Sequence, residues 1–101
     1  MDIEFLYWEG CPSHPEARQL LEDVLAEREI DADVNVREVR SQAEAEELRF
    51  PGSPTIRVDG RDIQPPAEQE PPGLTCRVYH LRDGRISPLP DAEDIKEALE
   101  G

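Results

Sequence analysis

A junction between a predicted strand and a predicted helix organises this sequence of 101 residues. It runs from Ile3 to Pro15 and reads IEFLYWEGCPSHP. The run Ile3–Tyr7 is short, apolar and rich in aromatic and branched side chains, which is typical of a buried strand, and Gly10 ends it. Apolar residues recur at helical spacing after Pro15. Cys11 therefore lies where a strand ends and a helix begins.

This position predicts that Cys11 is a reactive thiol. The first turn of a helix has backbone N–H groups without intrahelical partners, and together with the helix dipole they favour an anion. A thiolate is such an anion, and cysteine pKa values fall at helix N-termini. His14 is expected to modulate the thiol by lowering its pKa or by moving its proton. A carboxylate at Glu9 acts in the opposite direction.

The first forty residues predict a β-α-β unit. The helical face after Pro15 consists of Ala17, Leu20, Leu21, Val24 and Leu25, with Ser13 as the expected N-cap. A second strand is expected over residues 33–39, where Val34 and Val36 alternate with polar residues. Ser41 and Glu44 then form a capping-box pattern that opens a short helix, which Pro51-Gly52 ends. Two parallel strands joined by a right-handed crossover follow from this order.

The second half alternates strand-like runs with turns. In order, the expected elements are a strand at 55–58, an Asp59-Gly60 hairpin turn, a return strand at 61–63, a proline-rich insertion at 64–73, a strand at 74–81, a turn at Asp83-Gly84 and a helix at 92–99 capped by Pro90-Asp91.

Length and charge restrict the function further. We expect residues 1–101 to form a single domain. Lys and Arg number 11 against 24 Asp and Glu, and the resulting charge of −13 argues against a nucleic-acid or anionic-membrane partner. The sequence shows no membrane-spanning run and no signal peptide, so a cytoplasmic location is expected. In that compartment two cysteines are expected to be free, catalytic or metal-binding rather than a structural disulfide.

The motifs around Cys11 and Pro54 resemble the thioredoxin-like superfamily. The resemblance covers residues 3–63 and the last helix, and it consists of Trp8-x-x-Cys11-Pro12 at a helix start, a β-α unit, and Gly52-Ser53-Pro54-Thr55 opening a strand. It implies an α/β fold with a mixed central sheet and helices on both faces. It also implies a cis peptide bond before Pro54, with that proline beside the active cysteine. The expected substrate groove consists of Trp8, Pro12, Ser53 and Pro54.

The chain departs from the superfamily at the resolving position. Redox members carry Cys-x-x-Cys, whereas this chain reads Cys11-Pro12-Ser13-His14. Cys76 is the candidate resolving thiol, because an antiparallel third strand and its hairpin would bring the later chain back toward Cys11. An equally weighted alternative makes Cys76 a core residue that alternates with Leu74 and Val78 on the buried face of a strand.

Three functions remain open from the sequence. The leading one is a thiol–disulfide oxidoreductase that acts on a thiol or disulfide substrate without a cofactor. The segments at 52–60 and 74–79 also resemble small bacterial proteins associated with alkylmercury lyases. That resemblance implies a soft-metal or organomercurial site made by Cys11, Cys76 and His14. The third is a non-catalytic interaction module with the same fold.

Overall fold

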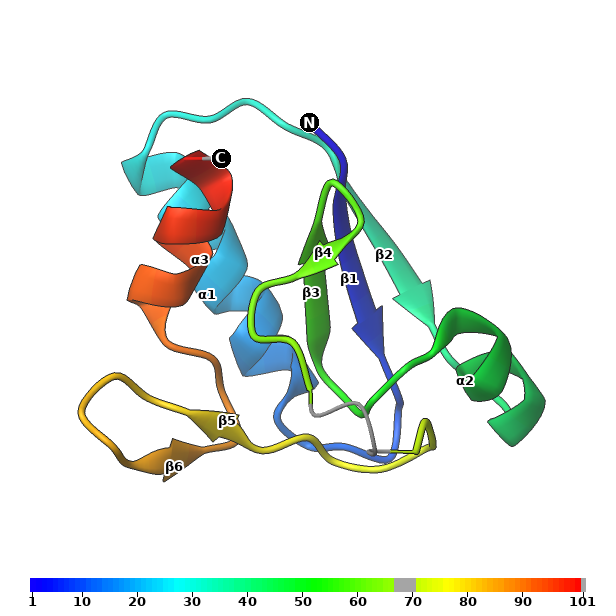
Figure 1. The fold of residues 1–101 in the computed structure, drawn as a ribbon. Helices are drawn as coiled ribbons and strands as arrows, with labels where there is room; N and C mark the ends of the chain where they lie inside the picture. The colour runs from blue at the N-terminus through cyan, green and yellow to red at the C-terminus, as the bar shows by residue number, and fades with distance from the viewer. Residues whose placement is uncertain (67–70, 101) are drawn as a thin grey trace.

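The computed structural model describes residues 1–66 and 71–100 and has a mixed α/β architecture (Figure 1). Its elements are β1 (Ile3–Tyr7), α1 (His14–Glu27), β2 (Val34–Glu38), α2 (Gln42–Leu48), β3 (Thr55–Val58), β4 (Arg61–Asp62), β5 (Tyr79–His80), β6 (Ile86–Ser87) and α3 (Ala92–Glu100). The first four strands form one sheet in the order β2-β1-β3-β4, and β5 pairs with β6 in a second, two-stranded sheet.

The central sheet is mixed, as expected from the sequence. β1 pairs in parallel with β2 and antiparallel with β3, so that Phe5 lies between Val36 and Ile56. β4 returns antiparallel to β3 through Asp59 and Gly60, which both have positive φ angles, 52° and 82°. Positive φ at both central residues is what a two-residue hairpin turn requires. The predicted β-α-β unit and the antiparallel third strand are confirmed.

Helices cover both faces of this sheet. α1 and α3 lie together on one face, on the left in Figure 1, and α2 lies on the other. The larger core cluster contains Ile3, Phe5, Ala17, Leu21 and Ile95 among its buried members. The smaller cluster, on the α2 side, consists of Leu6, Val39, Ala45 and Phe50. The alternation of Phe5 and Leu6 within β1 thus supplies one residue to each core.

The caps of α2 and α3 follow the sequence signals with one difference, whereas the predicted N-cap Ser13 of α1 makes no side-chain capping bond. Ser41 Oγ accepts a hydrogen bond from Glu44 N at 3.1 Å, as a capping box requires. The Glu44 carboxylate accepts from Arg40 N at 2.8 Å instead of from the cap residue itself. Asp91 caps α3 by accepting from Glu93 N at 2.9 Å. These bonds satisfy N–H groups that a helix leaves unpaired at its start.

The predicted strand at 74–81 is wrong in extent. Only β5 and an isolated parallel bridge between Ser53 and Cys76 form there. Arg77 and Tyr79 are buried, whereas Cys76 is exposed and Val78 is 56 % exposed. The alternative that placed Cys76 in the core beside Val78 is therefore overturned.

Polar partners explain why Arg77 is buried in place of Val78. The Arg77 guanidinium, 7 % exposed, donates to both carboxylate oxygens of Asp62, at 2.7 and 2.9 Å, and to Thr55 Oγ1 at 3.2 Å. It also donates to the carbonyl of Gln64 and lies 4.4 Å from the centre of the Tyr79 ring. A bidentate pair of this kind satisfies a guanidinium that would otherwise be costly to bury.

The Tyr79 hydroxyl fixes the same segment from the other side. It donates to the carbonyl of Pro54 at 2.5 Å. Burial raises the pKa of Tyr79, so this hydroxyl keeps its proton and remains a donor. Arg77 and Tyr79 together attach the chain after the insertion to the start of β3.

The predicted insertion at 64–73 lies partly outside the described residues, because 67–70 are not among them. Its two ends are irregular and are hydrogen-bonded to the rest of the chain. Gly73 N donates to the carbonyl of Phe50 at 3.0 Å, and Gln42 Nε2 donates to that of Pro72, also at 3.0 Å. Gln64 exchanges two hydrogen bonds with the backbone of His80.

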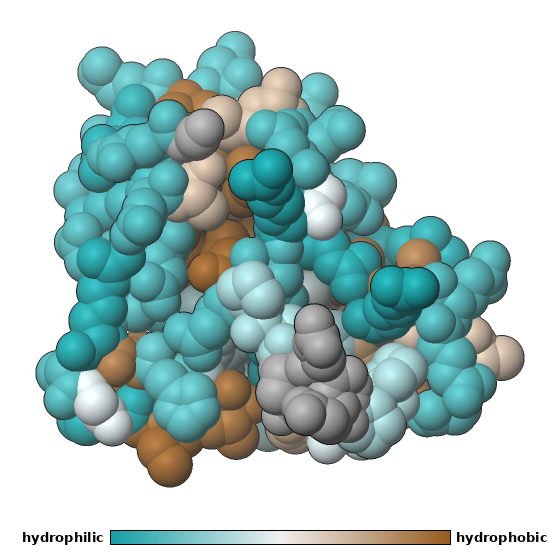
Figure 2. All heavy atoms as spheres, in the orientation of Figure 1, coloured by the Kyte–Doolittle hydropathy of each residue, from teal (hydrophilic) through white to brown (hydrophobic). Residues whose placement is uncertain are grey.

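No helix within the described ranges is long and apolar enough to cross a membrane. Most of the face shown in Figure 2 is hydrophilic, in keeping with the charge of −13. An apolar area at the lower left lies over the β5–β6 hairpin, where Ile86 is 68 % exposed.

We expect Arg77→Leu to lower the free energy of unfolding by about 3–5 kcal/mol, because it leaves Asp62 buried without its partner. The matched control is Arg85→Leu, which removes an exposed pair with Asp83 and should cost no more than about 1 kcal/mol. Denaturant titration followed by circular dichroism measures both. Equal losses in the two variants would show that the buried pair does not hold this segment.

Candidate functional site

The two cysteines of the chain meet at the end of the sheet where β1 stops and β3 starts. Cys11 follows β1, and Cys76 lies on the segment that pairs with Ser53 (Figure 1). Ser53 N donates to the carbonyl of Thr75, and Arg77 N donates to the carbonyl of Ser53, both at 2.8 Å. The Cys11 thiol donates to that same carbonyl at 3.4 Å. Ser53 thus places the two cysteines next to each other.

The peptide bond between Ser53 and Pro54 is cis, as the resemblance implied. Thr55 Oγ1 donates to the carbonyl of Gly52 at 2.7 Å, and Tyr79 donates to that of Pro54, so side chains hold the backbone on both sides of this bond. Ser53 and Pro54 are both buried. They therefore lie beneath the thiols and do not form an exposed wall of the predicted groove.

The surroundings of Cys11 favour its thiolate. Only 1 % of this residue is exposed, and burial by itself raises the pKa of the thiol. Hydrogen bonds from the side chain and backbone N–H of Ser13 and from the Cys76 thiol outweigh that effect, so that the pKa of Cys11 is lowered. The Ser13 hydroxyl is 3.1 Å from Cys11 Sγ. Ser13 stands at the N-cap of α1, but its side chain makes no capping bond.

The surroundings of Cys76 have the opposite effect. Its interaction with Cys11 raises the pKa of the Cys76 thiol, because the proton it shares with the Cys11 thiolate is harder to lose and two adjacent negative charges repel each other. Burial adds a smaller contribution in the same direction. Both residues are free thiols in the structure. The two thiols thus differ in direction, with the pKa lowered at Cys11 and raised at Cys76.

The Ser53 hydroxyl is a further polar group beside Cys11. It is completely buried, and Ser53 Oγ has no hydrogen-bond partner among the described residues while Cys11 is a thiol. It lowers the pKa of Cys11 in the same way as Ser13 does, by donating to the thiolate. The Ser53 hydroxyl is thus close enough to act on a Cys11 thiolate, although it makes no hydrogen bond within the described part of the chain. An unpaired buried hydroxyl is otherwise a cost of about 1–3 kcal/mol.

The structure does not bring His14 to the thiol pair, in contrast to its predicted role. Its ring stacks on Tyr7, with ring centres 4.5 Å apart, and its Nε2 lies 3.7 Å from Glu9 Oε2. His14 is also not among the groups that shift the pKa of Cys11. Within the described part of the chain, no three His, Cys, Asp or Glu side chains are close enough together to hold a metal ion.

The remaining residues of the predicted groove differ in how deeply they are buried. Trp8 is half-buried against the α2-side core, and Pro12 is exposed. The indole lies directly over Gly10, where an added Cβ would stand 2.4 Å from Trp8 Cζ2. Gly10 is thus required by the packing of Trp8, in addition to ending the strand. Of the four predicted groove residues, only Pro12 is fully exposed near Cys11.

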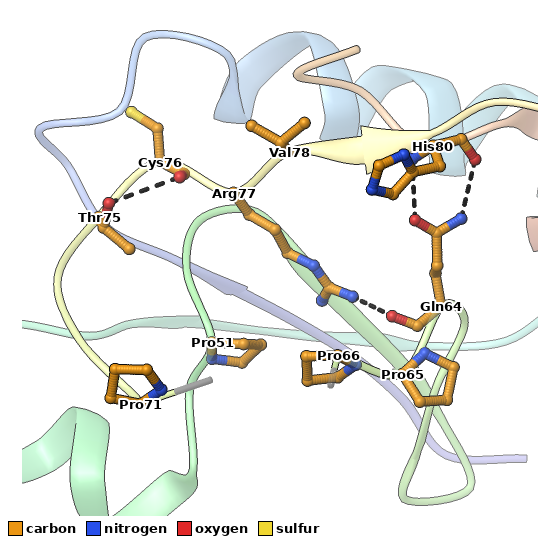
Figure 3. A pocket seen from close by; sticks show the side chains of 10 residues that line it. All are labelled: Pro51, Gln64, Pro65, Pro66, Pro71, Thr75, Cys76, Arg77, Val78 and His80. Carbon is orange, nitrogen blue, oxygen red and sulfur yellow. Dashed lines mark hydrogen bonds between the residues drawn. The ribbon is translucent and has the colours of Figure 1, made fainter. Parts of the chain in front are cut away.

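A pocket of about 540 Å³ lies on the other side of the Cys76 segment. Its walls include Pro51, Pro65, Pro66 and Pro71, together with Arg77 and His80 (Figure 3). Figure 3 shows the Cys76 sulfur turned away from these prolines, toward the loop that precedes α1, with Val78 turned to the same side. The exposed thiol, that of Cys76, therefore faces away from the prolines of the pocket.

Sequence reasoning found both cysteines but missed the groups that tune and position them. The sequence predicted Ser13 as the N-cap of the helix, whereas its hydroxyl oxygen lies 3.1 Å from the Cys11 sulfur. Arg77 and Tyr79, which position Cys76, were not singled out, because a strand pattern alone does not show that an arginine is buried. One signal in the sequence could have indicated a buried basic residue. Asp62 is an acidic residue at the end of β4, and its carboxylate pairs with Arg77.

Comparisons with protein-family models, with curated proteins and with solved structures gave no match to this chain.

Proposed function

We propose that this chain is a thioredoxin-like thiol–disulfide exchange protein whose redox centre is the pair Cys11 and Cys76. The observation that carries the proposal is the placement of these two free thiols beside Ser53, which the Cys11 thiol hydrogen-bonds and Cys76 pairs with, and their pKa values are pushed in opposite directions. A pair in which one sulfur ionises easily and its neighbour keeps a proton is the arrangement that thiol–disulfide exchange requires.

Three features of the site support a redox role over a purely structural one. The thiols are next to each other, yet one of them is exposed, so the pair is accessible from solvent. Ser13 and Ser53 supply hydroxyl groups to the buried sulfur. The hydrogen bonds of the Ser53 backbone to Thr75 and Arg77 hold the two segments together. Cys76 supplies the second thiol, which the sequence Cys11-Pro12-Ser13-His14 lacks.

The alternatives make different predictions. A soft-metal site would bind a soft cation stoichiometrically, and Cys11→Ser would abolish that binding. Metal binding would not require a disulfide between the two cysteines. An interaction module would leave Cys11 with an ordinary thiol pKa of about 8.5. Neither alternative accounts for the hydroxyl groups directed at Cys11.

Mild oxidation with diamide should join Cys11 and Cys76 in one molecule. We expect the loss of both titratable thiols and a monomer lighter by two hydrogen atoms in mass spectrometry. Dithiothreitol should reverse both changes. Cys11→Ser and Cys76→Ser should each keep one titratable thiol or form intermolecular dimers. If the wild-type chain also gives only dimers, the two cysteines do not form a redox pair.

The ultraviolet absorbance of the thiolate should show that Cys11 titrates below the ordinary thiol range of about 8.5. Ser13→Ala should raise this midpoint by about one pH unit, because a hydrogen bond to a charged group contributes about 1.5 kcal/mol and 1.36 kcal/mol equals one unit. Ser41→Ala is the matched control. It loses a true cap bond and about 1 kcal/mol of stability, but it should leave the midpoint unchanged.

The same shift predicts how stability depends on pH. Between the lowered pKa of folded Cys11 and about 8.5, the unfolded chain binds more protons than the folded chain, so the free energy of unfolding should rise with pH. As the pH falls through the lowered pKa, this contribution should be lost. Denaturant titrations of the wild type and Cys11→Ser across this window measure the difference. A constant difference between them would contradict a lowered pKa in the folded state.

A further inference from the structure

We infer that Cys76, and not Cys11, is the sulfur at which the partner thiol enters, and that Cys11 is the leaving group of the exchange. The inference rests on the proposed redox pair and assigns the order of events within it. In this order the disulfide form of the chain oxidises partner thiols. It also reverses the roles that the sequence predicted, where Cys11 was the nucleophile and Cys76 resolved the mixed disulfide.

The solvent exposure of the two sulfurs determines which of them a partner thiolate can attack. A thiolate must approach a disulfide in line with the S–S bond, from the side opposite the sulfur that leaves. Behind Cys11 lie Ser13 and the buried Ser53, and only 1 % of Cys11 is exposed. Cys76 is exposed, and Val78 on the same side is 56 % exposed (Figure 3). The open line of approach therefore leads to Cys76.

The leaving group favours the same order. Exchange is faster when the departing sulfur is the more stable thiolate. Cys11 departs into hydrogen bonds from the side chain and backbone of Ser13, which its sulfur already contacts at 3.1 Å. Cys76 would depart as a thiolate without these donors and beside the other sulfur. Geometry and thiolate stabilisation thus select the same reaction.

The balanced sequence has two steps. A partner thiolate attacks Cys76 Sγ, the Cys11–Cys76 bond breaks, and the electron pair leaves on Cys11 as a thiolate. A second partner thiolate then attacks the partner sulfur of the mixed disulfide, and Cys76 leaves and takes up a proton. The partner dithiol becomes a disulfide, and the chain gains two electrons. A low-molecular-weight disulfide regenerates the Cys11–Cys76 bond by the reverse exchange.

The test locates the mixed disulfide in the full chain without substitutions. The diamide-oxidised chain is mixed with N-acetylcysteine amide, an uncharged monothiol, and the reaction is quenched with acid at short times. Free thiols are then blocked, and peptide mass spectrometry locates the adduct. We expect adducts on Cys76 to exceed those on Cys11 by at least about tenfold at early times.

The outcomes separate this inference from the proposed function. If the disulfide forms but the early adduct lies mainly on Cys11, the order of events is wrong and the redox pair stands. If no intramolecular disulfide forms on oxidation, the proposed function itself fails. Ser13→Ala supplies a second readout, because weakening the leaving group should slow adduct formation several-fold while the adduct stays on Cys76. An unchanged rate would contradict Cys11 as the leaving group.

Discussion

The buried ion pair between Arg77 and Asp62 is the constraint on which the site depends. Asp62 belongs to β4 at the edge of the central sheet, and Arg77 follows an insertion that departs from that same edge. By joining them, the pair draws the returning chain across the start of β3. Arg77 N can then donate to the carbonyl of Ser53, and Cys76 is carried to the side of Cys11. Without this anchor, the two hydrogen bonds at Ser53 and the bond from the Tyr79 hydroxyl to the Pro54 carbonyl would be left to hold the segment.

The ion pair between Arg77 and Asp62 also explains why the exposed Cys76 is held in a defined position. Side chains alternate along the segment, so burying Arg77 and Tyr79 forces Cys76 and Val78 outward. Burying Val78 instead would reverse every position and turn Cys76 into the core. The ion pair and the Tyr79 hydroxyl therefore set which way the second thiol faces, in addition to stabilising the fold. A buried salt bridge of this kind contributes specificity of register more than net stability.

Hydropathy could predict the elements whose buried residues are apolar. β1, α1 and α3 follow from periodic apolar positions, and the Asp59-Gly60 turn and the Ser41 cap follow from local backbone chemistry. The same reasoning failed at 74–81 because the buried residues there are an arginine and a tyrosine. Their burial is favourable only when Asp62, Thr55 and the Pro54 carbonyl are already in place. Those partners lie 15 to 25 residues away in sequence, beyond what a local pattern can show.

The candidate site illustrates the same limit in its chemistry. The sequence could place a thiol at a helix start, and it suggested His14 as its neighbour because the spacing is one helical turn. In the tertiary structure the His14 ring stacks on Tyr7, and serine hydroxyl groups lie beside the Cys11 sulfur instead. Neutral donors stabilise a thiolate without adding a proton that titrates near neutral pH. Because a serine hydroxyl stays neutral where a histidine would change charge, the donors to Cys11 are the same on both sides of neutral pH.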